Sequence, residues 1–149
     1  MIAEEFRVVA VVYLAILAPL IIYFLNKHKI PDWVPSFYIV GVIVCSLGWE
    51  LWFTYGWIDG DPVDSRRSEV LNNWLPKNIN WLLNSMADAG TVLIGGVWLM
   101  WISHKKNSKV FTQWNWSAFC ILMIWCIGQN ILVEMFLYHD QLAEGKPLS

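Results

Sequence analysis

The chain has 149 residues, a net charge of −2, 57% hydrophobic residues, 15% charged residues and 11 tryptophans. An ordinary soluble domain has about 25% charged residues, and a small protein cannot hide this much apolar surface from water. The composition also excludes a disordered chain, and the acidic balance argues against nucleic acid as a partner. We therefore expect one integral membrane domain covering residues 1–149, in the endoplasmic reticulum if the chain is eukaryotic and in the inner membrane if it is bacterial.

Four apolar runs are long enough to cross a bilayer core, which needs about 20 helical residues. The predicted spans are residues 8–25, 36–57, 80–102 and 117–138. They are too long and too continuously apolar for the alternating strands of a β-barrel. The segment from Ala3 to Arg7 lacks the basic character of a signal peptide, so we interpret the first run as a retained span. The sequence thus predicts an all-α fold, a four-helix transmembrane bundle.

The connections between the spans carry the charge. The two short connections contain five lysines, and the opposite face, with both termini and the long loop 58–79, also has five Lys and Arg residues. The positive-inside rule therefore does not fix the orientation. We keep a preference for short connections that face the cytoplasm.

Cysteine and histidine do not form a cofactor motif. Cys45, Cys120 and Cys126 lie inside the predicted spans and are odd in number, which disfavours a disulfide framework. The three histidines fall at span edges or in loops, away from the facing positions that haem ligation needs. No spacing typical of a zinc site occurs. We expect neither a metal nor another cofactor.

Three carboxylates lie inside the predicted spans: Glu50, Asp88 and Glu134. A charged residue at the centre of a span costs about 2.5–3.5 kcal/mol, so such residues are usually functional and face the protein interior. Because alternate spans run in opposite directions, all three acids are displaced toward the face of the long loop. No Lys or Arg within a span neutralises them. This pattern indicates acid–base chemistry, with interhelical hydrogen bonding as the structural alternative.

Helical spacing gathers polar residues near these acids. The stripes are Ser46, Glu50, Phe53 and Trp57 in the second span, Asn80, Asn84, Asp88, Thr91 and Gly95 in the third, and Cys126, Asn130, Glu134 and Tyr138 in the fourth. Three such stripes predict a polar pocket between the second, third and fourth spans. The candidate catalytic residues are Glu50, Asp88 and Glu134. The candidate substrate-binding residues are Trp49, Trp52, Phe53, Asn84, Thr91, Trp98, Gln129, Asn130 and Tyr138.

Three classes of function fit an acidic pocket inside a membrane. The first is an enzyme in which one acid protonates an alkene, aromatic rings stabilise the carbocation and a carboxylate removes a proton elsewhere. The second is a protein that captures the amine of an amphipathic ligand. The third is a proton-coupled transporter, which with four short spans would need a homodimer.

The order of these residues resembles the emopamil-binding protein family (EXPERA-type), which contains membrane sterol isomerases and sigma-2 receptor relatives. The matching elements are Glu50-Leu51-Trp52-Phe53, Asp64-Ser65-Arg66, Asp88 with Thr91, Gly128-Gln129 with Glu134, and Tyr138-His139. The resemblance implies that Glu50 and Asp88 are a catalytic pair and that Thr91 lies beside the second acid. The chain differs where the family has a second-span His and a third-span Glu, here Ser46 and Asp88. The family's isomerases also have a fifth span.

A second stretch, Gly48-Trp49-Glu50 followed by aromatic residues and Tyr55, is similar to the Trp-Glu-aromatic motif of small membrane-bound terpene cyclases. The two resemblances imply the same acid–base mechanism and different substrates. We therefore expect an isomerase or a cyclase of lipid metabolism that acts on a sterol-like or isoprenoid lipid. The alternative is a non-catalytic protein that binds sterols or cationic amphiphiles.

Overall fold

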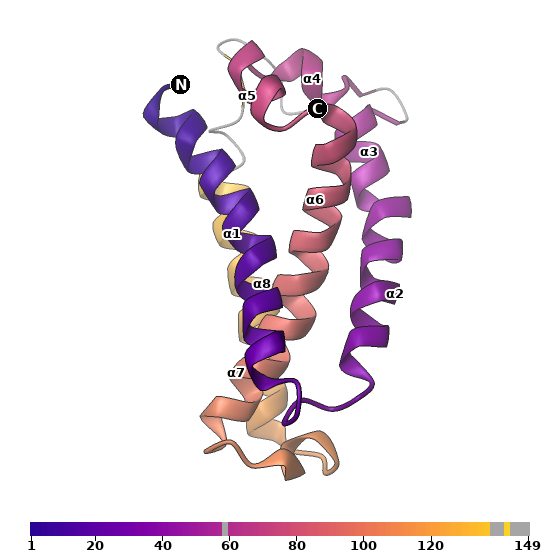
Figure 1. Ribbon diagram of the computed structural model, residues 1–149, viewed down its shortest axis with the longest axis vertical. Coiled ribbons are helices and arrows are strands. Elements are labelled where there is room, and N and C mark those ends of the chain that lie inside the picture. The colour runs from indigo at the N-terminus through magenta and orange to yellow at the C-terminus, as the bar shows by residue number, and fades with distance from the viewer. Residues whose placement is uncertain (58–59, 138–141, 144–149) are drawn as a thin grey trace.

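The computed structural model describes residues 1–57, 60–137 and 142–143, without the side chains of Glu134 and Phe136. Within these residues every regular element is a helix, which confirms the predicted all-α class. The long helices run along one axis, and two short helices lie across one end (Figure 1). The shared axis follows from the sequence, because long apolar helices separated by short connections pack antiparallel to their neighbours.

The first predicted span is helix α1, Ala3–Asn26. It begins five residues before the apolar run, because Glu5 accepts a hydrogen bond from the backbone N–H of Ile2 at 2.9 Å and closes the first turn. Pro19 lies inside the helix. A β-carbon at Gly90, in the third predicted span, would lie 3.2 Å from the Pro19 ring. The absence of a side chain at Gly90 therefore lets that span approach α1 closely.

The second predicted span is broken. Helix α2, Val34–Leu47, and helix α3, Trp49–Tyr55, are bent by 43° at Gly48. Gly48 permits this break, because a β-carbon there would lie 2.8 Å from the carbonyl oxygen of Val44. The expected continuous helix over 36–57 is therefore wrong. The predicted stripe is interrupted as well, since Ser46 belongs to α2 and Trp57 lies beyond the end of α3 with 60% of its surface exposed.

The third predicted span is a continuous helical stretch made of α6, Lys77–Ala89, the π-helix η1, Gly90–Gly95, and α7, Gly96–Ser103. It is the central element, because α6 packs against α1, α2 and α3. The π-helix widens the backbone, and the indole Nε1 of Trp125 donates to the carbonyl oxygen of Thr91 at 2.7 Å. Single π-helical turns inside α-helices are frequent at functional sites.

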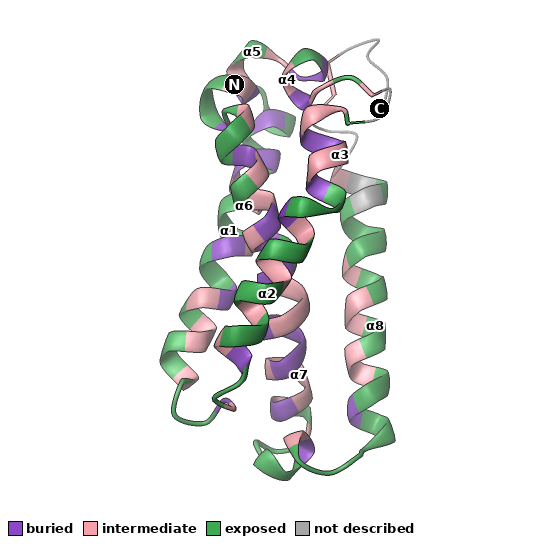
Figure 2. Ribbon diagram, turned by 90° about the vertical axis from the view of Figure 1, so that its right-hand side faces the viewer, coloured by how far each residue is buried: buried purple, intermediate pink, exposed green. Residues whose placement is uncertain are grey.

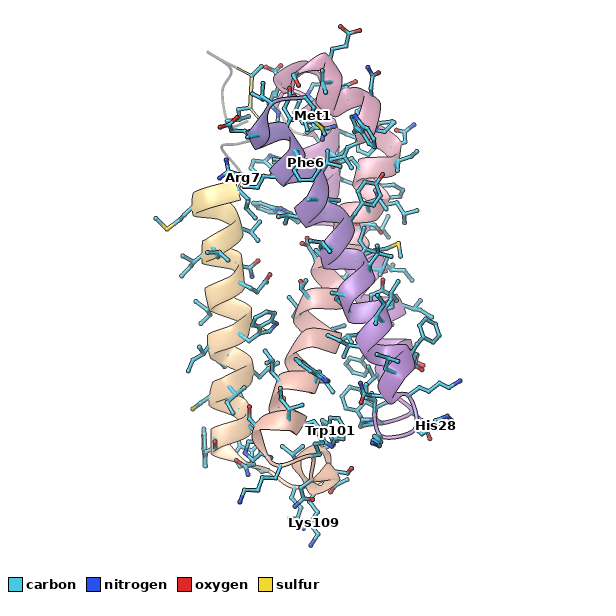
Figure 3. The ribbon with its side chains drawn as sticks, turned by 60° about the vertical axis from the view of Figure 1, so that its left-hand side comes forward. Met1, Phe6, Arg7, His28, Trp101 and Lys109 are labelled. Atoms are coloured by element: carbon cyan, nitrogen blue, oxygen red, sulfur yellow. The ribbon has the colours of Figure 1, made fainter. Side chains whose placement is uncertain are left out.

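The fourth predicted span is helix α8, Trp116–Leu132, continued by the π-helix η3, Val133–Leu137. Helix α8 packs on α7, where a β-carbon at Gly96 would lie 2.6 Å from Leu122 Cδ1. Ala118 is buried, and most other described residues of α8 are partly or fully exposed (Figure 2). Away from α7, the ribbon of α8 stands apart from α1 (Figure 3).

The long loop is a folded unit, whereas the sequence predicted only a connection. Helices α4, Val63–Arg66, and α5, Glu69–Trp74, form what we call the cap, which closes one end of the helices (Figure 1). Leu71 and Leu75 pack against Val8 and Val9 of α1. Ser68 Oγ donates to Glu5 Oε1 and accepts from the backbone N–H of Leu71, so one hydroxyl both begins α5 and ties it to α1.

Length and composition allow two described helical stretches to cross a membrane, α1 and Lys77–Ser103, and a third if the bent pair α2 and α3 forms one span. Helix α8 is apolar and shorter, at 17 residues. Many large apolar side chains of these helices are exposed, and large exposed apolar surfaces are typical of sites that contact a membrane or another protein.

Replacing Gly56 by alanine should lower the thermal stability of the protein. Gly56 ends α3 with a φ of 66°, a conformation that costs a residue with a β-carbon about 1–2 kcal/mol. The new β-carbon would also clash with the carbonyl oxygen of Gly60. Thermal unfolding of the detergent-solubilised protein measures the effect. Gly128→Ala is the control, because a β-carbon there would have no described atom within 4 Å apart from its chain neighbours and the backbone of its own helix. Equal losses in both variants would contradict the prediction.

Candidate functional site

A cavity of about 130 Å³ lies between α1, α3, α6, η1, α8 and η3. Seven predicted site residues line it: Trp49, Glu50, Phe53, Asn84, Asp88, Thr91 and Gln129. We call it the acidic cavity, because two of these residues are carboxylic acids. The structure therefore brings together residues that the sequence placed on three separate spans.

Glu50 is the buried acid of the cavity, with 3% of its surface exposed. It follows the bend at Gly48 by two residues, so the break in the second span determines where it points. Its Oε2 accepts hydrogen bonds from Thr54 Oγ1 at 3.0 Å and from Asn84 Nδ2 at 3.4 Å. A buried carboxylate is costly unless hydrogen-bonded, and these two donors supply such bonds from α3 and α6.

Asp88 is the more open acid. It lies one helical turn after Asn84 on α6 and is exposed, although it lines the same cavity. Thr91 follows on η1, and its hydroxyl bonds to the carbonyl oxygens of Ala87 at 2.8 Å and of Asp88 at 3.2 Å. Thr91 therefore stabilises the backbone at the start of the π-helix. Two carboxylic acids with unequal environments in one cavity are a recurrent arrangement in acid–base catalysis.

Helix α1 forms an apolar wall that the sequence analysis missed. Its four lining residues are Val8, Val11, Val12 and Ala15. The first span contains no polar stripe, so periodicity gave no reason to place it at the site. The helical spacing of small and β-branched residues on α1 was the available signal, and it is shared by ordinary packing faces.

Some predicted residues are not brought into the cavity. Trp52 packs against Trp49, with 4.8 Å between ring centroids, and does not line the cavity; neither does Trp98. Asn130 is exposed and donates to the carbonyl oxygen of Cys126 at 3.0 Å, a bond within its own helix. The expectation that Trp52, Trp98 and Asn130 line the pocket is thus corrected. The side chain of Glu134, on η3, and all of Tyr138 lie outside the described residues.

Two buried arginines adjoin the cavity, and the sequence analysis treated both as loop residues. Arg66 has 2% of its surface exposed. Its Nη2 donates to the carbonyl oxygen of Phe53 at 2.5 Å, and its Cζ lies 4.9 Å from the centre of the Phe53 ring. A cation at the last turn of a helix satisfies a carbonyl that has no partner within the helix. The cap thus places a positive charge against a wall of the cavity, although no predicted span contains Lys or Arg.

Arg67 joins the cap to α6. Its Nη1 donates to Asn80 Oδ1 at 3.2 Å and its Nη2 to the carbonyl oxygen of Leu75 at 2.8 Å. Burial lowers the pKa of the guanidinium to about 10, and the charge of Asp64 opposes this shift. Arg67 is therefore still protonated at neutral pH. Asn80 also lines the acidic cavity, so this contact links the cap to the site.

No family model matches the chain, and comparison with curated proteins and with solved structures found no similar protein.

Replacing Arg67 by methionine should lower the free energy of unfolding by about 2–3 kcal/mol, because a hydrogen bond to a charged group contributes about 1.5–3 kcal/mol and Asn80 and Leu75 would lose their donor. Lys77→Met is the matched control. Lys77 forms a partly exposed ion pair with Asp64 at 2.9 Å, and surface pairs contribute about 0–1 kcal/mol. Chemical denaturation in detergent measures both variants. A loss at Arg67 no greater than at Lys77 would refute a structural role for this arginine.

Proposed function

We propose that the chain is an integral membrane protein with four spans, formed by α1, by α2 with α3, by α6 to α7, and by α8 with η3. The 17 residues of α8 and the five of η3 together reach the length that a bilayer core requires, about 20 residues. The four tracts match the four apolar runs of the sequence.

Within this bundle, we propose acid–base chemistry on an apolar lipid. The observation that carries the proposal is that Glu50 and Asp88 line one cavity whose remaining walls are largely apolar. An ordinary structural hydrogen bond between helices does not need two carboxylic acids at an open cavity. A soluble polar substrate would not need walls of valine, alanine and aromatic rings.

The reaction would proceed through a carbocation. One acid, in its protonated form, gives its proton to a carbon–carbon double bond, and the cation forms at the neighbouring carbon. The face of Trp49 stabilises positive charge, whereas the Phe53 ring already contacts the guanidinium of Arg66. The second carboxylate removes a proton from another carbon, so the double bond moves or a ring closes with no net change in protons. Thr54 and Asn84 orient the Glu50 carboxylate through their hydrogen bonds.

The substrate class follows from the two resemblances of the sequence. A sterol-like lipid agrees with the likeness to the emopamil-binding protein family, and an isoprenoid agrees with the likeness to terpene cyclases. Both are lipids with largely hydrocarbon skeletons and isolated double bonds, and both would enter the cavity from the membrane. Glu134 and Tyr138 complete the proposed set of site residues, because both fall in the fourth apolar run of the sequence, 117–138, whose Val133 and Leu137 line the cavity.

Deuterium incorporation tests the enzymatic proposal. Purified protein in deuterated water, supplied with sterol and polyprenyl lipids, should yield product that carries deuterium. Glu50→Gln and Asp88→Asn should each lower the rate about 10²–10⁴-fold, the usual contribution of a general acid or base. Glu69→Gln is the control, because Glu69 is an exposed acid of the cap. Full turnover by both cavity variants would reject catalysis by these acids.

The alternative function is capture of a cationic amphiphile without turnover. A carboxylate in an apolar cavity can hold an ammonium group as a charge-assisted hydrogen bond. In that case, an amine with a long apolar tail should bind the wild type and bind Glu50→Gln at least tenfold more weakly. Displacement of a labelled amine in detergent micelles measures the affinity. Amine binding with an unchanged lipid after incubation supports this alternative, and deuterated product supports the enzyme.

A further inference from the structure

The end of the molecule opposite the cap contains a second cavity, of about 170 Å³. It lies in the connection between α7 and α8 and is lined by His104, Asn107, Lys109, Gln113, Trp114 and Asn115, together with Val110. The acidic cavity lies elsewhere and shares no residue with it. We call this second cavity the basic pocket, because Lys109 is its charged residue and no carboxylic acid lines it.

The basic pocket is rich in hydrogen-bond donors. The side-chain oxygens of Asn107 and Asn115 are already used, since they accept from the backbone N–H groups of Lys109 at 3.0 Å and of Ala118 at 3.1 Å. Their amide Nδ2 groups therefore remain to donate. The Lys109 ammonium and the Trp114 indole N–H are donors as well. This combination of donors, with one positive charge and no carboxylate, is suited to an anion.

The backbone before the pocket is strained. Lys105 and Lys106 both adopt left-handed conformations, with φ values of 54° and 61°. This conformation is unfavourable for residues with a β-carbon. Such backbone strain is commonly found where binding of a ligand or another function requires it. The two residues reverse the chain after α7, which brings Asn107 and Lys109 to the pocket.

The surroundings of the pocket have an uncompensated positive charge. The two connections at this end contain five lysines, Lys27, Lys29, Lys105, Lys106 and Lys109, and one acid, Asp32. Within the described residues none of these lysines forms an ion pair, and the ammonium groups of Lys29 and Lys106 each lie 5.9 Å from the centre of the Trp101 ring. At the cap end the cations are engaged, since Arg66 and Arg67 donate to backbone or amide oxygens and Lys77 pairs with Asp64. Figure 3 shows Lys109 and His28 at one end of the molecule and Arg7 at the other.

Exposed tryptophans surround the same end. Trp33, Trp114 and Trp116 have 44%, 68% and 68% of their surfaces exposed. Tryptophan is enriched where a membrane protein crosses from hydrocarbon to headgroups. The pocket lies between the ends of two apolar helices, α7 and α8, so the anion nearest to it in a membrane is a lipid phosphate.

We propose that the basic pocket binds the phosphate headgroup of an anionic phospholipid, with Lys109 supplying the charge and the amides of Asn107 and Asn115 supplying hydrogen bonds. The site is separate from the acidic cavity and does not depend on its function. The proposal also assigns this end of the molecule to the more anionic leaflet.

Native mass spectrometry of the full chain in detergent tests the proposal. The protein is mixed with equal amounts of phosphatidylglycerol and phosphatidylcholine that have identical acyl chains. The wild type should bind phosphatidylglycerol at least fivefold more tightly, and Lys109→Gln should reduce this preference about fivefold, the effect expected of one lysine near an anionic headgroup. Lys27→Gln is the matched control, because it removes the same charge from the same end and does not line the pocket. Its preference should stay within twofold of the wild type.

Three results would overturn the proposal. The first is a wild type with no preference for phosphatidylglycerol. The second is an equal loss in Lys27→Gln and Lys109→Gln, which would mean diffuse surface charge and no defined site. The third is displacement of the lipid by 10 mM inorganic phosphate but not by chloride at about the same ionic strength. That result would assign the pocket to a soluble phosphate. Circular dichroism of Lys109→Gln verifies that the variant keeps its helix content.

Discussion

One oxygen of Glu50 accepts a hydrogen bond from Thr54 within α3 and another from Asn84, and the bond from Asn84 joins α3 to α6. A buried carboxylate has to be hydrogen-bonded, because removing it from water without donors is costly. The bend at Gly48 satisfies this requirement, since it directs the first turn of α3 toward α6. The acidic cavity lies beside this bond, and residues of α1, α8 and η3 line its other sides.

The cap extends the same principle to the end of the helices. Arg66 contacts the ring and the carbonyl oxygen of Phe53, and Arg67 contacts Asn80, so each arginine binds a residue that lines the cavity. Leu71 and Leu75 bury the opposite side of the cap against α1. The cap and the cavity are thus one structural unit. Arg66 connects the cap to α3, which carries Glu50, and Arg67 connects it to α6, which carries Asn84.

The sequence predicted the parts of this fold that local hydropathy and helical spacing control. Long apolar runs predicted the helices, and the spacing of Asn84, Asp88 and Thr91 predicted one lining face, which the structure confirms. The bend at Gly48 was missed because its signal is a single glycine in an apolar run. The cap was missed because its stability comes from contacts with α1 and α3 that are distant in sequence. Arg66 and Arg67 were interpreted as loop residues, since nothing in the local sequence indicates that Arg66 contacts the carbonyl oxygen and ring of Phe53 or that Arg67 contacts Asn80.

The roles of the tryptophans also depend on tertiary contacts that the local sequence does not reveal. Trp49 and Trp52 are three residues apart in one short helix, and their rings contact each other, yet only Trp49 lines the cavity. Helical spacing makes them neighbours on one face, and it does not distinguish Trp49, which is 53% exposed and lines the cavity, from Trp52. Trp125 was outside the predicted site, and its indole donates to the π-helix that contains Thr91. The sequence position of an aromatic residue inside a span therefore predicts that its ring packs against another helix. Whether the ring lines the cavity or bonds to a neighbouring backbone depends on which helix lies opposite.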